Sequence, residues 1–430
     1  MPLIRLIAAF AGLTYVLCAP AFAADEMTAI VAARLIDGRT STVRTDVAVL
    51  VEGERIRAIV DRSQIPASFE LIDLGDATLL PGFIDAHIHP LISTDDYQTD
   101  HLKWSSAYKA LRGLSAVQEV LRAGWTSIRI AGDADVHYAH LDLRRAIDAG
   151  LFEGPRIYGA GHYISTTGGG GDINYISPEH SVTADGLVVD GPEEIRKAIR
   201  REIKFGSDWI KLLVTGAFMS AKDNPRNVHF SEVELAAAVD EATRRGVPVM
   251  AHAHAAEGIN MAVRAGVRSI EHGTFLDDEG IELMLEHGTY LVPTTFIGDY
   301  YIEKGSADGS QSKMVELSKR YRGEHFERLG AAIRAGVKVV VGSDGVGFPP
   351  DQNAREFALL VEAGMTPMEA LQAGTRVAAE LLQHEDDIGT LEAGKLADLV
   401  AVPGNPLEDM RVLERVSFVM IGGRVVATDD

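Results

Sequence analysis

The chain has 430 residues, of which 46% are hydrophobic and 24% charged, a composition typical of a globular protein with one large domain and a smaller one. Its 41 Lys and Arg residues and 62 Asp and Glu residues give a formal net charge of -21, which leaves no basic face for nucleic acid or an anionic membrane surface. Because Cys18 is the only cysteine, disulfides and thiolate metal sites are excluded from the rest of the chain.

The first segment, MPLIRLIAAFAGLTYVLCAPAFAADE, differs from everything after it. It has one positive charge at Arg5, an apolar middle and the small-x-small pattern of residues 21–23, which is typical of a signal peptide. We therefore expect residues 1–23 to be removed and the protein to be secreted or periplasmic, with no membrane contact after cleavage. A retained anchor is the alternative, although the apolar run is short for a bilayer. A lipoprotein at Cys18 is a further alternative, for which Leu17 is a poor preceding residue.

The two ends of the chain share a β-like pattern. Residues 28–76 alternate and turn like strands, and residues 396–430 do likewise. Strands from opposite ends of a chain can pair, so we expect a small β-sandwich formed by residues 24–77 and 392–430. Residues 78–391 are then left as the large domain.

The middle of the chain repeats one pattern: a short β-branched run, a turn and an amphipathic stretch. Helical stretches such as SEVELAAAVDEATRRG end in Gly, and Ser231 with Glu234 fits a capping box. The predicted strands are 78–88, 126–131, 156–160, 209–214, 248–253, 269–272, 290–295 and 338–343. Eight strands alternating with helices predict an α/β fold, a (β/α)8 TIM barrel, with an open doubly wound sheet as the alternative.

Two stretches are too long for plain turns. The Gly-rich insert STTGGGGDINYISPEH (165–180) and the polar stretch 298–313 are candidate lids over the site.

Polar side chains recur at the C-terminal ends of the predicted strands, where barrel enzymes place their catalytic groups. The segment LLPGFIDAHIHPLIS (79–93) contains His87 and His89, which point to one face because side chains two apart on a strand share a face. Two imidazoles aimed at one place favour a metal site, and satisfied core histidines are the alternative. Later strands add further candidates: Lys211, His252, His254, His272 and Asp344.

Lys211 lies in the apolar segment DWIKLLV, where a charged and unpaired lysine is costly to bury. A neutral lysine amine can capture carbon dioxide as a carbamate, which is a carboxylate on a long arm able to bridge two cations. The alternative is a lysine paired with a nearby acid. The four histidines and the aspartate at other strand ends favour the carbamate.

Six segments resemble the amidohydrolase superfamily in their order along the chain: PGFIDAHIHP, WIKLLVTG, AHAHAAEGI, SIEHGT, VGSDG and GTLEAGKLADLV. Within it, the chain resembles the binuclear zinc peptidases, the branch of Xaa-Pro and Xaa-Arg dipeptidase-like carboxypeptidases and ochratoxin-hydrolysing amidases. The resemblance implies a hydrolase that cleaves an amide or peptide bond of a small peptide or N-acyl amino acid and releases a C-terminal amino acid. It also implies two Zn²⁺ per subunit and a homo-oligomer, with an octamer as one form.

The family pattern carries roles onto single residues of this sequence. It makes His87, His89 and Asp344 ligands of one metal and His252 and His272 ligands of the other, with Lys211 bridging them as its carbamate. A water between the metals would attack the scissile carbonyl as hydroxide, because metal binding lowers its pKa from about 16 to roughly 7. Asp344 would take that proton and pass it to the leaving amine.

Three further histidines are candidates outside this ligand set. His254 shares a strand face with His252 and is the alternative ligand, although the family match favours His252. His162 and His229 follow the third and fourth predicted strands and are candidate substrate-binding residues, with a structural role as the alternative. The chain has only glycine at 168–171, where relatives often have a histidine, and His229-Phe230 where relatives offer a tyrosine, so substrate preference does not carry over.

Two other functions stay open. An imidazolonepropionase- or deaminase-like cyclic amidohydrolase usually lacks a lysine bridge on the fourth strand, so Lys211 discriminates against it. A barrel relative that has lost its ligands would be a binding protein, but all six candidate ligands are present here.

Overall fold

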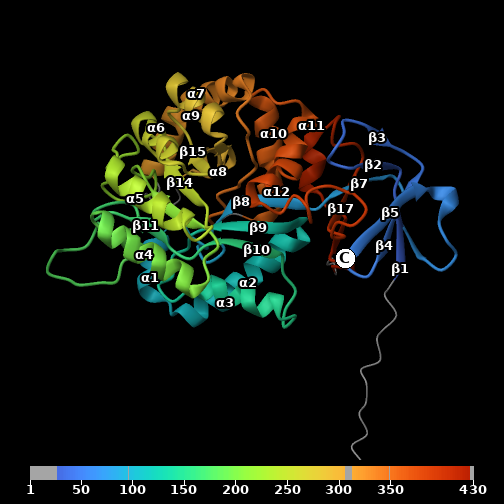
Figure 1. Ribbon diagram of the computed structural model, residues 1–430, viewed down its shortest axis with the longest axis horizontal. Helices are drawn as coiled ribbons and strands as arrows, with labels where there is room; N and C mark the ends of the chain where they lie inside the picture. The colour runs from blue at the N-terminus through green and yellow to red at the C-terminus, as the bar shows by residue number, and fades with distance from the viewer. Residues whose placement is uncertain (1–26, 95, 306–311, 348, 427–430) are drawn as a thin grey trace, which may run out of the picture.

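The structure is a computed structural model that describes residues 27–94, 96–305, 312–347 and 349–426. A group of β-strands from both chain ends lies beside a larger body of helices and strands (Figure 1). The predicted signal peptide, 1–23, lies outside the described residues. Among the helices of the described residues, none has both the length and the apolar character that a membrane span needs.

Two sheets hold the strands from the chain ends. One has the order β5-β4-β1-β6, and the other has the order β19-β18-β17-β7-β2-β3. Their strands are β1 (Met27–Val31), β2 (Arg34–Ile36), β3 (Val43–Arg44), β4 (Val47–Glu52), β5 (Arg55–Asp61), β6 (Glu70–Asp73), β7 (Ala77–Pro81), β17 (Leu399–Pro403), β18 (Phe418–Ile421) and β19 (Arg424–Val425).

Strand β17 joins the two ends of the chain. It pairs antiparallel with β7 along its whole length. Side chains of both sheets pack in one hydrophobic core, in which Ile30 of β1 is buried together with Leu79 of β7 and Leu399 of β17. The first and last parts of the sequence thus form one β-structure with a shared apolar interior.

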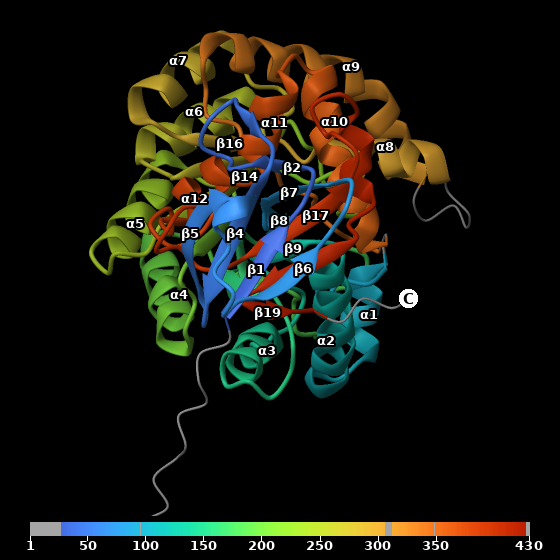
Figure 2. The same ribbon diagram turned by 90° about the vertical axis from the view of Figure 1, so that its right-hand side faces the viewer.

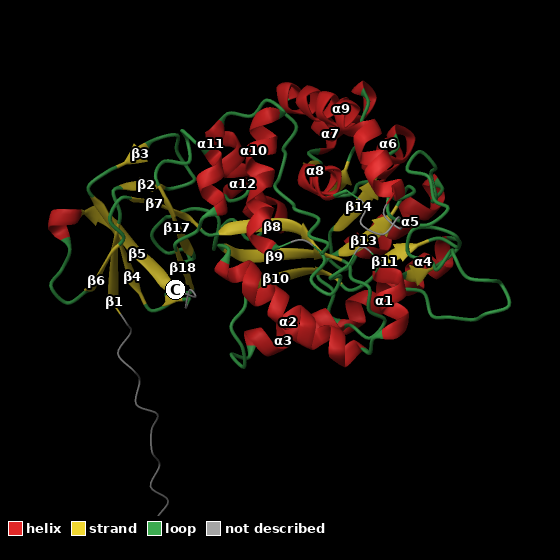
Figure 3. Cartoon of the chain, turned by 180° about the vertical axis from the view of Figure 1, so that it is seen from behind, coloured by secondary structure: helices red, strands yellow, loops and turns green. Residues whose placement is uncertain are grey.

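Parallel strands form the centre of the larger body, as Figure 3 shows. One sheet has the order β10-β9-β8 and the other β12-β11-β13-β14-β15-β16. The amides of Asp208 and Trp209, just before β13, donate to the carbonyl of Gly159 in β10 and connect the two sheets. The strands are β8 (Phe83–Ile88), β9 (Trp125–Ala131), β10 (Arg156–Ala160), β11 (Tyr163–Ser165), β12 (Leu187–Val188), β13 (Ile210–Leu213), β14 (Val249–Ala253), β15 (Ser269–His272) and β16 (Tyr290–Val292).

The predicted first strand, 78–88, is two strands in the structure. Gly82 separates them, because a Cβ atom at this position would clash with the side chain of Thr126. The Gly82 amide donates to the carbonyl of Asp398 (2.9 Å). Residues 77–81 therefore pair with the C-terminal segment, and only 83–88 belong to the parallel strands.

The sequence predicts a continuous last strand over 338–343, and the structure corrects this. The amide of Val340 donates to β16 and the amide of Asp344 donates to β8, so the segment lies between these strands. The ladder is interrupted because the Val341 amide donates instead to the carbonyl of Ala373 (3.1 Å). Only isolated bridges remain.

Helices surround the parallel strands, with the terminal strands in front of them in Figure 2. The capping box predicted at Ser231 is present, since the Ser231 amide donates to the Glu234 carboxylate at 2.8 Å and the Glu234 amide donates to the Ser231 hydroxyl. The helices are α1 (Tyr97–Lys103), α2 (Ser106–Arg122), α3 (Ala139–Asp148), α4 (Pro192–Phe205), α5 (Glu232–Thr243), α6 (Ala256–Ala265), α7 (Asp278–His287), α8 (Thr295–Lys304), α9 (Ser312–Ala335), α10 (Arg355–Glu362), α11 (Pro367–Ala373) and α12 (Arg376–Leu382).

The two candidate lids differ. Between β11 and α4 the chain forms only the two-residue strand β12, so the Gly-rich insert is a long loop as predicted. The stretch 298–313 is helical up to Lys304, because α8 continues through it.

Candidate functional site

The predicted metal ligands lie together at the carboxyl ends of the parallel strands. One cavity of about 140 Å³ is lined by all six of them: His87, His89, Lys211, His252, His272 and Asp344. The ring centroids of His87 and His272 are 5.1 Å apart, and those of His252 and His272 are 4.6 Å apart. Residues from five separate segments therefore converge on one place.

Two groups of potential ligand atoms are close enough to hold cations. The atoms of His252, His254 and His272 lie within 4.8 Å of one another, as do those of His87, His272 and Asp344. His272 belongs to both groups. His89 lies beside the second group, with Nε2 3.3 Å from Asp344 Oδ1.

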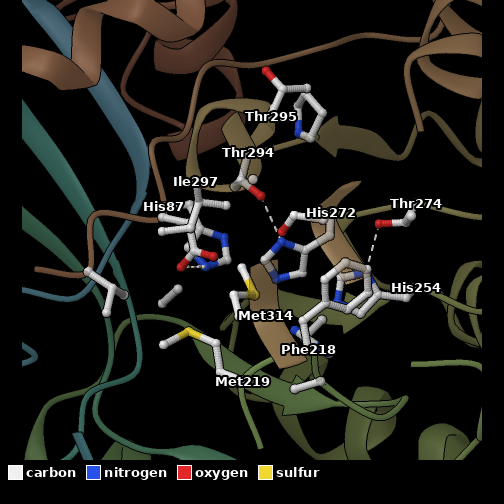
Figure 4. Close-up of a pocket in the computed structure, with 18 of the residues that line it drawn as sticks. His87, Phe218, Met219, His254, His272, Thr274, Thr294, Thr295, Ile297 and Met314 are labelled. Carbon is white, nitrogen blue, oxygen red and sulfur yellow. Dashed lines mark hydrogen bonds and ion pairs between the residues drawn. The ribbon is translucent and has the colours of Figure 1, made fainter. Parts of the chain in front are cut away.

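Hydrogen bonds decide which ring nitrogen each histidine leaves free. Nδ1 is engaged in four of them: His87 with Glu271, His89 with the Gly132 carbonyl, His254 with Thr274 and His272 with Thr294, at 2.6 to 2.8 Å. Figure 4 shows the last two contacts. In His252 it is Nε2 that contacts a carbonyl, that of Gly216, at 3.3 Å. Such outer partners fix the tautomer and orientation of metal-binding histidines.

The partner of His87 belongs to a buried ionic group. Glu271 Oε2 accepts from His87 Nδ1 at 2.7 Å, and both Glu271 oxygens accept from Arg129 at 2.9 Å. Ser269 adds a further hydrogen bond to Glu271, and the Arg129 guanidinium lies over the Trp209 ring at 4.6 Å. The side chains of Arg129 and Glu271 are completely buried. Because Glu271 accepts the hydrogen bond from His87 Nδ1, this buried group fixes the orientation of the His87 ring.

Burial keeps four of the histidines, His87, His252, His254 and His272, neutral. It lowers the pKa of His87 to about 4 and that of His252 to about 3, with the Lys211 charge adding to the effect in both. Burial, followed by neighbouring histidines, also lowers the pKa of His254 and His272 well below the usual value. A neutral imidazole has a free electron pair, which is the form that binds metals.

Asp344 is the carboxylate of the site. Burial opposes its ionisation, but the hydrogen bond from His89 and the nearby Lys211 amine together hold its pKa well below the usual value. Its ionised carboxylate is therefore available as a metal ligand and as a proton acceptor.

Lys211 points into the same cavity and is only 2% exposed. Burial lowers its pKa to about 8, while the charges of Glu271 and Asp344 act in the opposite direction. Ion pairs of lysines with acids occur at Lys109, Lys338 and Lys395, whereas no acid of the described residues forms one with Lys211. The alternative in which Lys211 is paired with a nearby acid is therefore not what the structure shows.

Three non-glycine residues at consecutive strand ends have left-handed backbone conformations. They are His272 (φ 72°), Thr294 (φ 50°) and Asp344 (φ 51°). Such conformations cost of order 1–3 kcal/mol each and cluster at functional sites. The backbone at these three positions is therefore strained, and the surrounding structure of the cavity holds it in this conformation.

His162 is not among the residues that line this cavity. Its Nδ1 contacts Glu202 at 2.9 Å, its amide donates to the same carboxylate, and the residue is fully buried. Tyr163, its neighbour, pairs with Lys211 and lines the cavity. Because adjacent strand residues face opposite sides, Tyr163 faces the cavity and His162 faces away.

His229 also lies outside the set of cavity-lining residues. Its Nε2 contacts Asp223 Oδ1 at 3.1 Å, in the loop after β13. The sequence pattern indicates His162 and His229 as substrate-binding residues, whereas the cavity is lined by other polar residues that the pattern does not indicate: Tyr97, Tyr163, Thr294 and His325. The pairing of Tyr163 with Lys211 depends on strand register, for which the sequence carried no signal.

The donor set fits divalent cations. Imidazole nitrogens and carboxylate oxygens are the ligands of zinc sites without cysteine. Here neutral, buried imidazoles have fixed orientations and lie within ligand distance of an ionised carboxylate. His87, His89, His252, His254, His272 and Asp344 are the residues that could hold such ions.

Comparison with known proteins agrees with this geometry. The family model described as Amidohydrolase family matches residues 78–426. The ochratoxinase of Aspergillus niger is 32% identical over 429 residues, covering 93% of this chain and 86% of that protein.

Two solved structures are similar over nearly the whole chain. A Xaa-Pro dipeptidase with methionine bound in its active site has a TM-score of 0.86 and 36% identity, covering 94% of this chain and all of that one. A prolidase in complex with N-methylphosphonate-L-proline has a TM-score of 0.86 and 33% identity at the same coverage. These similarities imply a TIM barrel-like fold and support hydrolysis of an amide or peptide bond.

Proposed function

Because this chain belongs to the amidohydrolase family, we propose that it hydrolyses an amide or peptide bond in a small substrate and releases a C-terminal amino acid. The observation that carries the proposal is the group of neutral, oriented histidines around Asp344 and Lys211 in one cavity. Similarity to an ochratoxinase and to a Xaa-Pro dipeptidase supports a dipeptide or N-acyl amino acid as substrate.

The proposal includes two Zn²⁺ per subunit. His87, His89 and Asp344 would hold one ion, His252 and His272 would hold the other, and Lys211 as its carbamate would contact both. His254 is close enough to take the place of His252. Ions bound there would polarise the scissile carbonyl and make a water more acidic.

Asp344 is the residue that moves protons in this proposal. Its carboxylate is ionised and lies 3.3 Å from His89 Nε2 and 3.5 Å from His87 Nε2. It accepts a proton from the attacking water and returns it to the nitrogen of the leaving amine, so one carboxylate acts as base and then as acid.

Formation of the Lys211 carbamate needs only carbon dioxide. The nitrogen lone pair forms an N–C bond while one C=O π bond of carbon dioxide opens, and one proton of the nitrogen passes to solvent, which gives a carboxylate with a single negative charge. Burial lowers the pKa of Lys211 to about 8, so a substantial neutral fraction exists at ordinary pH.

The proposal is tested by supplying zinc and bicarbonate to the purified protein and assaying dipeptides and N-acyl amino acids, including an ochratoxin-type amide. Lys211→Ala should lose activity by at least a hundredfold, and short carboxylic acids should restore part of it. Lys197→Ala, at an exposed position of α4, is the matched control. Two metals and full activity in unaided Lys211→Ala would contradict the carbamate.

The same assay separates the alternatives. One metal per chain with an unmodified Lys211 would favour a cyclic amidohydrolase of the imidazolonepropionase or deaminase kind. If no amide is hydrolysed with metal supplied, a binding protein becomes the better description.

We also infer the finer architecture from the pairings. With 338–344 lying between β16 and β8, the parallel segments are inferred to close into one eight-stranded barrel over residues 78–391. The terminal sheets, with their shared core, are inferred to form a sandwich from residues 24–77 and 392–430.

A further inference from the structure

The cavity has an apolar wall beside the ligand residues. It consists of six side chains from separate loops and helices, four of them buried in one hydrophobic cluster and two packed against it: Ile92, Phe218, Met219, Ile297, Met314 and Val346. Figure 4 shows Met314 close to His272 and Phe218 close to His254, with Ile297 next to His87. A substrate bound at the histidines therefore has to contact this wall.

Phe218 adds an aromatic surface to the wall. Its ring stacks on that of His254, with centroids 4.6 Å apart and an interplanar angle of 23°. The Tyr321 ring follows at 6.0 Å from Phe218. Flat rings in such positions bury aromatic groups and favour offset stacking or edge contacts with them.

Arg322 is the permanent cation among the described residues that line the cavity, and it has its own partners. Arg322 forms two hydrogen bonds to Asp299, at 2.6 and 2.9 Å, and a third to Glu362 at 2.9 Å. Asp299 itself lines the cavity. An acidic substituent of a substrate bound beside Arg322 would therefore lie near the Asp299 carboxylate, and the Arg322 charge is already paired.

We propose that the apolar wall binds a large, uncharged substituent of the substrate, an aryl or branched alkyl group, and that the site discriminates against an acidic substituent at this place. The inference rests on the proposed function, because it concerns the group attached near the scissile amide. Met219 and Met314 are flexible and polarisable, so the wall accommodates several apolar shapes.

Two matched substrate series test this proposal in the zinc-loaded enzyme. One varies the acyl group (acetyl, hexanoyl, naphthoyl, and the acidic 5-carboxypentanoyl as partner of hexanoyl) on a constant alanine. The other varies the released amino acid (glycine, leucine, phenylalanine, glutamate) on a constant acetyl group. In at least one series, kcat/KM should rise about ten- to hundredfold from the small to the large apolar member, since that is the effect of burying one large apolar side chain. The acidic member should fall at least tenfold below its uncharged partner.

Substitution in the wall provides a second measurement. Met219→Gln keeps the size of a half-buried side chain but makes it polar, and it should lower the large-to-small ratio of kcat/KM at least threefold. Met368→Gln, a half-buried methionine of α11, is the control and should leave the ratio unchanged. An unchanged ratio in Met219→Gln would count against the wall.

Asp299→Asn tests the charge part. It leaves Arg322 with Glu362 as its remaining carboxylate partner, so the ratio of acidic to uncharged substrate should rise at least threefold. If that ratio does not change, the pairing of Arg322 with Asp299 is not the cause of the discrimination against acidic substrates.

The outcomes distinguish the two proposals. If the small member and the large apolar members are hydrolysed equally well in both series, the inference about the wall fails and the proposed function stands. If no member of either series is hydrolysed with metal supplied, the proposed function fails.

Discussion

At the level of single residues, the site depends on which ring nitrogen each histidine has free. Four of the six histidines that line the cavity, His87, His89, His254 and His272, use Nδ1 for a hydrogen-bond partner, and for His87 this partner is Glu271. Glu271 in turn is held by Arg129. The outer residues therefore set the direction of the inner ones.

Glu271 is expected to act as a positioning residue. Glu271→Gln removes the charge that holds His87 Nδ1–H, and zinc affinity should fall about 10- to 100-fold, as is usual when an outer partner is lost. Competition with a chromophoric chelator measures the affinity without any assay of turnover.

A second variant separates positioning from folding. Glu271→Gln leaves the Arg129 charge buried and unpaired, which costs roughly 3–5 kcal/mol. The double variant Arg129→Met with Glu271→Gln removes both charges and should recover stability in urea unfolding without recovering zinc affinity. Recovery of both would show that the role of Glu271 is only structural.

Asp344 is expected to matter more for turnover than for metal content. Asp344→Asn keeps an oxygen ligand but is a poor proton acceptor, so kcat should fall about 10²- to 10⁴-fold, with zinc content measured by atomic absorption little changed. Asp351→Asn, at an exposed position of the turn before α10, is the control. Turnover near the wild-type value would remove Asp344 from the proton-transfer role.

Residue-level prediction from the sequence works where a polar side chain stands out in an apolar strand. His87, His252 and Lys211 show this signal, and so do Arg129 in WTSIRIA and Glu271 in SIEH. The position of His162 after a strand predicts it at the site. Its true orientation depends on the break between β10 and β11, which shifts the alternation by one residue.

At the level of elements, helix α8 depends on a carboxylate from another helix. Glu356 of α10 accepts hydrogen bonds from the Thr295 amide (2.9 Å), the Thr295 hydroxyl (2.8 Å) and the Phe296 amide (2.7 Å) at the start of α8. Since α8 carries Ile297 and Asp299 of the cavity, Glu356 helps to place one side of the site.

Glu356 predicts a pH dependence of stability. Burial raises the pKa of its carboxyl to about 7 from the ordinary value of 4.5, so the folded state favours the protonated form. Its favourable contribution is therefore complete below about pH 4.5 and is lost as the pH rises to about 7. Relative to Glu356→Gln, the wild-type protein should lose up to about 3 kcal/mol of unfolding free energy between pH 5 and pH 8.

Urea unfolding at several pH values measures this difference. Glu282→Gln, at an exposed position of α7, is the control, and its difference from wild type should not change with pH. A difference between wild type and Glu356→Gln that is flat over the same range would contradict the prediction.

Element prediction from the sequence succeeds for most strands and fails where tertiary contacts decide. The apolar runs predicted β9, β10, β14 and β15 within a residue. The run 338–343 looks equally strand-like, but its pairing depends on a carbonyl from α11 that is distant in sequence. The break at Gly82 likewise depends on Thr126, which no local pattern shows.

At the level of the whole molecule, a partly buried ion pair joins the terminal sheets to the larger body. Asp398, just before β17, accepts two hydrogen bonds from Arg156 of β10 at 2.8 and 3.1 Å and one from the Gly422 amide at 2.8 Å. Asp398 itself is 5% exposed. This contact ties the last part of the sequence to a central strand.

Removing the ion pair between Arg156 and Asp398 should destabilise the whole protein. Asp398→Asn keeps the shape but loses the charge, and the free energy of unfolding should fall by about 1–3 kcal/mol. Glu414→Gln breaks the exposed pair with Arg411 and should change it by less than about 0.5 kcal/mol. Chemical unfolding followed by circular dichroism measures the free energy of unfolding of both variants. Equal losses in Asp398→Asn and Glu414→Gln would show that the contact with Arg156 does not stabilise the protein more than an exposed ion pair does.

The pairing of β7 with β17 has a consequence for synthesis of the chain. During translation, β7 leaves the ribosome more than three hundred residues before its partner, because the partners are Ala77–Pro81 and Leu399–Pro403. At usual elongation rates this interval is on the order of half a minute. Throughout it one side of β7 has unsatisfied backbone groups and an apolar surface that can aggregate. The exposure of this edge therefore ends only when β17 is made and can pair with β7.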